Sequence, residues 1–204
     1  IITCDLSDEN ACIKLGRTLA KKDIYIFINN AGFGDLGSFD KTSLNKELSM
    51  INVNIKATHI LTKYMVKTFK KRNRGYIMNV ASSAGLLPGG PYMSTYYATK
   101  SYVVRLSESI REELKKENSK VQISILCPGP VDTNFNKVAN VKFHMREANS
   151  QKVADYAIKQ VQKGKFYIIP GIDVKFAKIG AKIAPASIVS KITYKIQKRK
   201  LQRK

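Results

Sequence analysis

Short apolar runs alternate with amphipathic stretches along most of the chain. Each run is as long as a strand and contains almost no polar residue, which is typical of strands buried on both faces of a parallel sheet. The stretches between the runs place apolar residues every three or four positions, as helices with one buried face do. The pattern predicts strands at residues 1–4, 24–28, 76–80, 121–126 and 166–169, and helices at residues 10–22, 44–69, 94–117 and 150–163.

This alternation predicts one α/β domain over residues 1–171, with a parallel sheet covered by helices on both faces. Residues 172–204 form a basic segment in which large apolar residues recur at helical spacing before and after Pro185. Because proline interrupts a helix, we expect two short amphipathic helices there, separated at Pro185.

The composition is that of a globular chain, with 44% hydrophobic residues, 12 Gly and 6 Pro. The three cysteines form no CxxC pair, which argues against a disulfide framework and indicates a reducing compartment, so we expect a cytoplasmic protein. His59 and His144 have no partner at metal-ligand spacing, and no metal site is expected. The longest stretch without charge, residues 76–99, is too rich in polar residues, Pro and Gly for a membrane helix.

The net charge of +21 is concentrated at the C-terminal end, where residues 163–204 contain twelve basic residues and one acidic residue. A basic amphipathic segment suits a lid over a cleft, a subunit contact or peripheral contact with a membrane. Nucleic acid is not expected as a partner, because the segment has no Arg-rich stretch interleaved with aromatic residues.

Small and polar residues follow three of the predicted strands, at residues 29–32, 81–85 and 128–133. In parallel sheets, ligands bind beyond these carboxyl ends. Tyr96 and Lys100 lie four residues apart on a predicted helix and therefore share a face. An ammonium beside a phenol lowers the pKa of the phenol, so the pair is a candidate acid/base unit.

Five motifs together resemble the short-chain dehydrogenase/reductase family in order and spacing, over residues 1–171. The motifs are Asn29-Asn30-Ala31-Gly32, Asn54, Ser83, Tyr96-x-x-x-Lys100 and Pro128-Gly129-x-x-x-Thr133. The interval of thirteen residues between Ser83 and Tyr96 favours Ser83 over Ser82. The resemblance implies a doubly wound parallel sheet of the Rossmann type in three α/β/α layers. It also implies an oxidoreductase that transfers hydride between NAD or NADP and a small-molecule carbonyl or alcohol.

The glycine-rich turn that holds the pyrophosphate in this family is not found in the sequence. We expect a chain that starts in the family's third strand and lacks the first two, with little activity on its own. An inactive fragment without cofactor and a membrane-surface protein are the alternative functions. The resemblance also implies a homodimer or homotetramer. Apolar residues after Thr133, namely Phe135, Val138, Val141, Phe143 and Met145, favour a moderately apolar substrate.

Four residues are expected to act in catalysis by resemblance. Tyr96 is the general acid/base, and Lys100 binds the nicotinamide ribose and lowers the pKa of Tyr96. Ser83 orients and polarises the carbonyl. Asn54 bends its helix and holds a water in the proton relay to Lys100.

The resemblance assigns cofactor contacts to Asp5, Leu6, Asn30, Ala31, Gly32, Tyr96, Lys100, Pro128, Gly129 and Thr133. Asp5 and Leu6 correspond to a pair near the adenine, and Thr133 to a contact with the nicotinamide carboxamide. Asp5 is equally compatible with an ordinary helix cap, and both interpretations stay open.

Overall fold

The computed structural model describes residues 1–141 and 147–201 of the chain. Their four strands form a parallel sheet in the order β1-β2-β3-β4, namely β1 (Ile26–Asn29), β2 (Tyr76–Val80), β3 (Gln122–Leu126) and β4 (Tyr167–Ile168). Three residues considered above, Phe143, His144 and Met145, lie outside the described residues.

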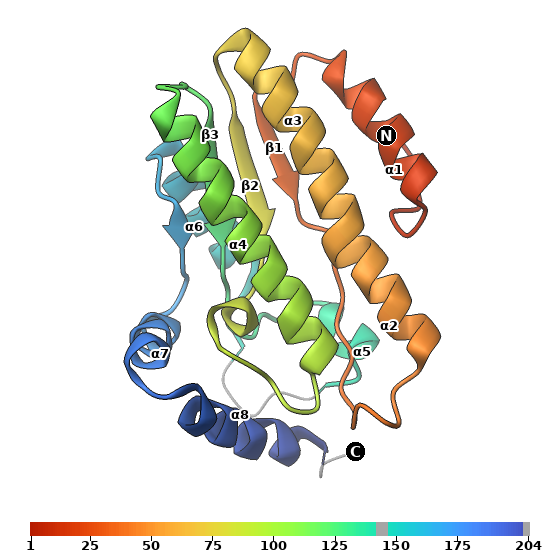
Figure 1. Ribbon diagram of the computed structural model, residues 1–204, viewed down its shortest axis with the longest axis vertical. Helices are drawn as coiled ribbons and strands as arrows, with labels where there is room; N and C mark the ends of the chain where they lie inside the picture. Colours follow the sequence, from red (N-terminus) through yellow and green to blue (C-terminus); the bar gives the residue numbers. More distant parts are fainter. Residues whose placement is uncertain (142–146, 202–204) are drawn as a thin grey trace.

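Helices cover both faces of the sheet and complete a three-layer α/β fold, as predicted (Figure 1). In chain order, the helical elements are α1 (Glu9–Ala20), α2 (Leu44–Ile51), η1 (Asn52–Ala57), α3 (Thr58–Arg72), η2 (Ser83–Leu86), α4 (Ser94–Lys116), α5 (Phe135–Val138), α6 (Ser150–Gln162), α7 (Ile172–Ile183) and α8 (Ala186–Leu201). None of the helices within residues 1–141 and 147–201 combines the length and apolarity needed to cross a bilayer.

Alternate residues of the central strands build two cores. Ile77 and Ile125 belong to a core formed with α3 and α4 on one face of the sheet. Met78 and Leu126 belong to a second core, formed with α6 on the other face. The period of two along a strand sends neighbouring side chains to opposite faces, so these apolar runs are buried on both sides.

The first strand departs from this pattern. Ile28 pairs in register with Met78, yet 38% of its surface is exposed. The core formed with α6 contains Met78 but does not extend to Ile28. The predicted burial of this strand on both faces is therefore wrong, because β1 is an edge strand of the described sheet and one of its faces is only partly covered.

Residues 1–4 form no strand, contrary to the prediction. Ile1 and Ile2 are exposed, and these residues have no neighbouring strand among the described residues. A strand exists only where its backbone exchanges hydrogen bonds with a neighbour, so the apolar run alone does not produce one.

The helix predicted at residues 44–69 is divided in the structure. Between α2 and α3, the segment η1 has π-helical hydrogen bonding, and Asn54 lies within it, almost fully buried. Such π-turns are frequent at functional sites. The expected bend at Asn54 thus coincides with a local change of helix type.

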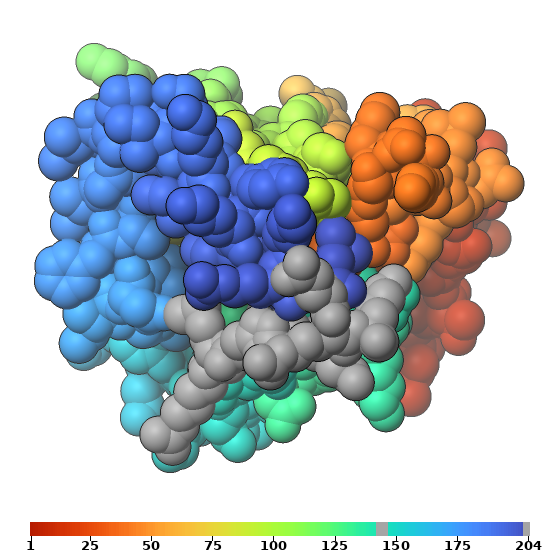
Figure 2. All heavy atoms as spheres, turned by 90° about the horizontal axis from the view of Figure 1, so that it is seen from below, coloured from red at the N-terminus to blue at the C-terminus, as the bar shows by residue number. Residues whose placement is uncertain are grey.

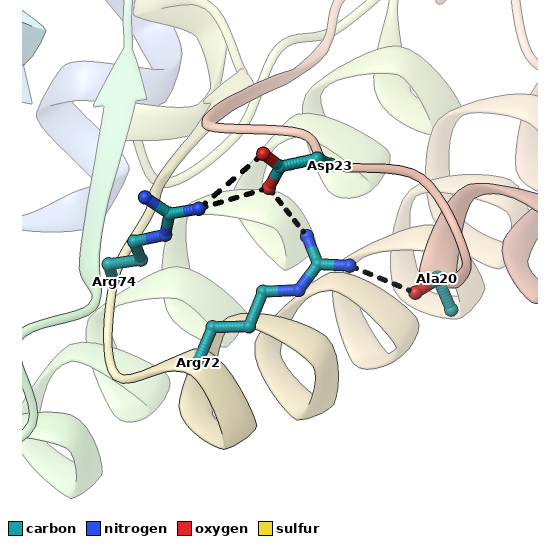
Figure 3. Close-up of polar contacts among 4 residues, drawn as sticks. All are labelled: Ala20, Asp23, Arg72 and Arg74. Atoms are coloured by element: carbon teal, nitrogen blue, oxygen red, sulfur yellow. Dashed lines mark hydrogen bonds and ion pairs between the residues drawn. The ribbon is translucent and has the colours of Figure 1, made fainter.

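The loop after α1 is fastened to the end of α3 (Figure 3). Asp23 forms ion pairs with Arg72 at 3.4 Å and Arg74 at 3.1 Å, and Arg72 also donates to the Ala20 carbonyl. Asp23 is largely exposed, so water weakens these pairs and their effect on stability is small. They orient α1, whose main packing is against α3.

The C-terminal segment forms α7 and α8, separated at Pro185 as predicted. Both helices lie beyond the carboxyl ends of the strands (Figure 1). They therefore flank the edge of the sheet at which a ligand is expected.

Candidate active site

A cavity of about 1140 Å³ opens at the carboxyl ends of β1, β2 and β3. The predicted site residues that line it are Asn30, Gly32, Ser83, Tyr96, Lys100, Pro128, Gly129 and Thr133. Asn54 lies behind this lining, while Asp5, Leu6 and Ala31 are not part of it. The structure thus brings most of the predicted residues together, because parallel strands present their carboxyl ends at one edge.

Tyr96 and Lys100 lie on one face of α4, and both are buried. The Nζ atom of Lys100 donates to the Val80 carbonyl at 2.9 Å and lies 5.9 Å from the centre of the Tyr96 ring. Phe135 packs against the same ring at 5.4 Å between centroids. The spacing of four residues therefore produces the expected pair, held between α4 and the end of β2.

Burial shifts the pKa of both members of this pair. Burial raises the pKa of Tyr96 to about 12, although a hydrogen bond with Ser82 lowers it in part. Burial also lowers the pKa of Lys100 to about 8. Without a cofactor, burial outweighs the groups that lower the Tyr96 pKa, because removing a phenolate from water costs more than they restore. The lowering of this pKa by Lys100 stays a prediction.

The two serines after β2 have different surroundings. Ser82 lines the cavity, its Oγ accepts from the Ala84 N–H at 3.1 Å, and its side chain partly offsets the raised pKa of Tyr96. Ser83 also lines the cavity, and its backbone N–H donates to the Pro128 carbonyl at 2.8 Å. Both serines thus lie at the cavity, and the preference for Ser83 over Ser82 from sequence spacing stays a prediction.

Asn54 joins three segments around the site. Its Nδ2 donates to the Phe33 carbonyl at 2.9 Å and to Thr99 Oγ1 at 3.0 Å, and its Oδ1 accepts from the Phe33 N–H at 3.1 Å. These bonds fix the loop after β1 against α4. The structure thus supports a positioning role for Asn54, and its role in a water relay stays a prediction.

Gly32 occupies the space between Asn54 and Lys100. A Cβ atom at this position would lie 2.9 Å from Asn54 Oδ1 and 3.1 Å from Lys100 Nζ. Any side chain would therefore displace one of these polar groups. Close approach explains the glycine, since no positive φ is required here.

The two asparagines of the first motif have separate roles. Asn29 is buried and donates to Thr62 Oγ1 at 3.0 Å and to Asn79 Oδ1 at 2.8 Å. Asn79 in turn donates to Ser107 Oγ at 2.9 Å. Asn29 is thus part of a structural network, whereas the next residue, Asn30, lines the cavity.

Asp5 and Leu6 lie before α1, outside the cavity lining. Asp5 Oδ1 accepts from the backbone and hydroxyl of Ser7, both at 2.8 Å, and the N-cap of α1 is Asp8. Asp5 therefore forms a turn before the helix without capping it. The cofactor contacts of Asp5, Leu6 and Ala31 stay predictions.

One further contact at the cavity was not found from the sequence. Gln197 on α8 is buried, lines the cavity and donates from Nε2 to the Tyr97 hydroxyl at 2.8 Å. Its Oε1 atom has no hydrogen-bond partner among the described residues. No local motif marks Gln197, because only the docking of α8 brings it to Tyr97.

Comparison with known sequences agrees with this arrangement. The sequence profile of the family described as short chain dehydrogenase matches residues 1–142. The chain belongs to the short-chain dehydrogenase family. It is similar to dehydrogenase/reductase SDR family member 11 from Bos taurus, with 29% identity over 169 residues, covering 76% of this chain and 66% of that protein. The chain spans less than two thirds of the length of the first curated relatives that it matches.

Solved structures share the fold. A short-chain dehydrogenase/reductase from Burkholderia phymatum in complex with NAD has a TM-score of 0.77 and 22% identity, covering 87% of this chain and 73% of that one. A short-chain dehydrogenase from Sphingobium yanoikuyae in complex with NADPH also has a TM-score of 0.77 and 22% identity, covering 88% of this chain and 71% of that one.

Proposed function

We propose that the protein is an oxidoreductase that transfers hydride between NAD or NADP and a carbonyl or alcohol substrate. The observation that carries this proposal is the buried Tyr96–Lys100 pair in a cavity at the carboxyl ends of the sheet, which Ser82 and Ser83 also line. Family membership and the NAD and NADPH bound in similar structures support it.

The lining of the cavity fits a nicotinamide dinucleotide. Gly32 and Gly129 line the cavity with backbone alone, while Asn30, Thr133 and the Lys100 ammonium offer polar contacts. The cavity, at about 1140 Å³, is slightly larger than the usual ligand pocket of about 300–1000 Å³, so it has room for more than one small molecule. When bound, the cofactor supplies or accepts the hydride.

Tyr96 would hold the proton that the substrate oxygen gains or loses. Because its pKa is raised to about 12, the phenol is protonated at neutral pH and suited to donate to a carbonyl that takes up hydride. The Lys100 ammonium faces the same ring and would stabilise the phenolate left after transfer. Ser82 and Ser83 would polarise the carbonyl from the other side of the phenol.

Replacement of Tyr96 by Phe tests this assignment. The ring and its packing remain, but the proton donor is lost, so turnover should fall by about 10²–10⁴-fold. The assay is NADH or NADPH oxidation with a panel of aliphatic and aromatic ketones. Binding of the cofactor, followed by its fluorescence, should be nearly unchanged.

Tyr102→Phe on the same helix is the matched control, since its hydroxyl contacts His59 and it does not line the cavity. Turnover by Tyr96→Phe equal to that control would contradict the proposed role. A native protein that binds neither NADPH nor NADH would instead support the alternative of an inactive fragment.

The substrate is proposed to be moderately apolar, because Leu87, Met93, Phe135 and Val138 contribute to the cavity lining. We also propose a cytoplasmic location and a homodimer or homotetramer, to be tested by cell fractionation and by native mass measurement. Peripheral contact of the basic C-terminal segment with a membrane is a further proposal, and its structural basis follows.

A further inference from the structure

The last helix has an inverted distribution of polar and apolar residues. It buries Val189, Thr193 and Gln197 and exposes Ile188, Ile192 and Ile196. Each set recurs every four residues, so each occupies one face of the helix. A helix packed on an apolar core normally buries its apolar face, whereas α8 turns much of its apolar face outward.

Specific hydrogen bonds hold α8 in this orientation. Thr193 Oγ1 donates to the Gly89 carbonyl at 3.1 Å, and Gln197 Nε2 donates to the Tyr97 hydroxyl at 2.8 Å. Rotating the helix to bury the isoleucines would break both bonds and expose Val189. The outward apolar face is therefore a consequence of how α8 docks.

The preceding helix, α7, exposes apolar side chains as well. On α7 and α8 together, seven large apolar side chains have exposed fractions between 44% and 80%, namely Ile172, Phe176, Ile179, Ile183, Ile188, Ile192 and Ile196. Figure 2 shows α7 and α8, in blue, side by side across the face seen from below. We call these seven residues the apolar face. Exposed apolar surface of this extent is typical of an interaction site.

Exposed lysines accompany the apolar face. They are Lys175 and Lys182 on α7, and Lys191, Lys195 and Lys198 on α8. Within residues 172–201 the one acidic residue is Asp173. No carboxylate forms an ion pair with any of the five lysines in the described part of the chain. The surface therefore suits a partner that is both apolar and negatively charged.

Charge distinguishes between the candidate partners. A second copy of the chain, related by a two-fold axis through this surface, would bring the same lysines close to one another. Nucleic acid would satisfy the lysines but offers no apolar layer to the isoleucines. The surface of an anionic bilayer satisfies both, because its phosphate groups lie directly above its acyl chains.

We propose that the apolar face of α7 and α8 docks on the surface of an anionic bilayer, with the five lysines at the headgroups. The same helices also line the cavity, through Val174 and Ala177 of α7 and Ile196 and Gln197 of α8, so the apolar face reaches the cavity at Ile196. Docking then places one wall of the cavity next to lipid, which favours carbonyl substrates that dissolve in the bilayer. This consequence for the substrate rests on the proposed function, whereas the docking itself does not.

Co-sedimentation with vesicles tests the docking without substrate or cofactor. The protein is mixed with vesicles of phosphatidylcholine and phosphatidylserine, and with vesicles of phosphatidylcholine alone. We expect binding to the mixed vesicles that weakens as salt is added, and little binding to the neutral ones. The double variants Ile188→Ser/Ile192→Ser and Lys191→Glu/Lys195→Glu should each weaken binding by about tenfold or more.

Matched controls make the same changes on other exposed helix surfaces. Leu44→Ser/Leu48→Ser alters two exposed apolar residues of α2, and Lys63→Glu/Lys67→Glu alters two exposed lysines of α3. Both controls should bind vesicles as the native protein does. Circular dichroism and NADPH titration of every variant separate loss of docking from loss of folding or of cofactor binding.

Three outcomes would overturn the proposal. They are no binding of the native protein to the anionic vesicles, equal loss of binding in test and control variants, and binding that the isoleucine changes leave intact. If the isoleucine variant instead converts a native dimer into a monomer, the apolar face belongs to a subunit contact. A protein that binds vesicles but neither cofactor would contradict the proposed function and leave the docking in place.

Discussion

At the scale of single residues, burial controls the acid/base properties of the site. The pKa of Tyr96 is raised and the pKa of Lys100 is lowered, yet both shifts favour the neutral form of the side chain. Desolvation always disfavours the charged state, which is the phenolate for one group and the ammonium for the other. Without a cofactor the phenol is therefore protonated at neutral pH, and the Ser82 side chain lowers its pKa only in part.

Separate substitution of the two serines tests which hydroxyl acts on the carbonyl. Because the Ser82 side chain lowers the pKa of Tyr96 in part, Ser82→Ala should lower kcat/KM by about 10²–10³-fold, the usual effect of removing one polarising donor. Ser83→Ala should lower it less than Ser82→Ala does. Steady-state kinetics with one ketone and NADPH measures both. The reverse order would restore the assignment made from sequence spacing.

At the scale of elements, a buried polar network joins the sheet to the helices above it. Asn79 on β2 accepts from Asn29 on β1 and Thr62 on α3, and donates to Ser107 on α4. All four side chains are buried, so each bond is made where an unpaired polar atom is costly. The network fixes how α3 and α4 lie on the strands, and thereby where Tyr96 and Lys100 reach the cavity.

Replacement of Asn79 by Ala should destabilise the protein strongly. The change removes three hydrogen bonds and leaves the buried donors of Asn29 and Thr62 with fewer partners, at a cost of about 2–4 kcal/mol in the free energy of unfolding. Urea unfolding measures the loss. Asn45→Ala, at an exposed position of α2, is the control and should change stability by less than about 0.5 kcal/mol. Equal effects of the two changes would contradict the importance of the network.

At the scale of the whole molecule, the site reduces the stability of the fold. The ammonium of Lys100 is buried against the end of β2, which costs free energy whenever the group is charged. Its pKa therefore falls from 10.5 to about 8 on folding. Below the pKa of the folded state, Lys100 is charged in both the folded and the unfolded protein, so folding carries the full cost of burying the ammonium. As pH rises above it, the folded state releases the proton first, and this cost declines.

The pH dependence of unfolding tests this effect. Between about pH 7 and pH 9, the native protein should gain about 1 kcal/mol in the free energy of unfolding relative to Lys100→Met, in which nothing titrates at this position. Urea unfolding at the two pH values provides the difference, with the exposed Lys63→Met of α3 as control. Parallel behaviour of the native protein and Lys100→Met would show that Lys100 keeps an ordinary pKa in the folded state.

Most elements of the fold were predictable from the chain because their signals are local. β2 coincides with the predicted apolar run, and α4 begins at Ser94 as the periodicity indicates. The exceptions depend on neighbours that a local pattern does not reveal. Residues 1–4 have an apolar run but no strand beside them, and β1 is exposed where α6 does not extend over it.

For the site, the sequence by itself determined which residues gather at the cavity, because spacing along helices and the ends of parallel strands are local properties. It thereby placed Tyr96, Lys100 and Gly32 correctly at the cavity lining. Only the tertiary structure decided the raised pKa of Tyr96, the docking of Gln197 at Tyr97 and the outward apolar face of α8. Each of these depends on which groups surround a residue and exclude water from it, and packing between distant segments creates those surroundings.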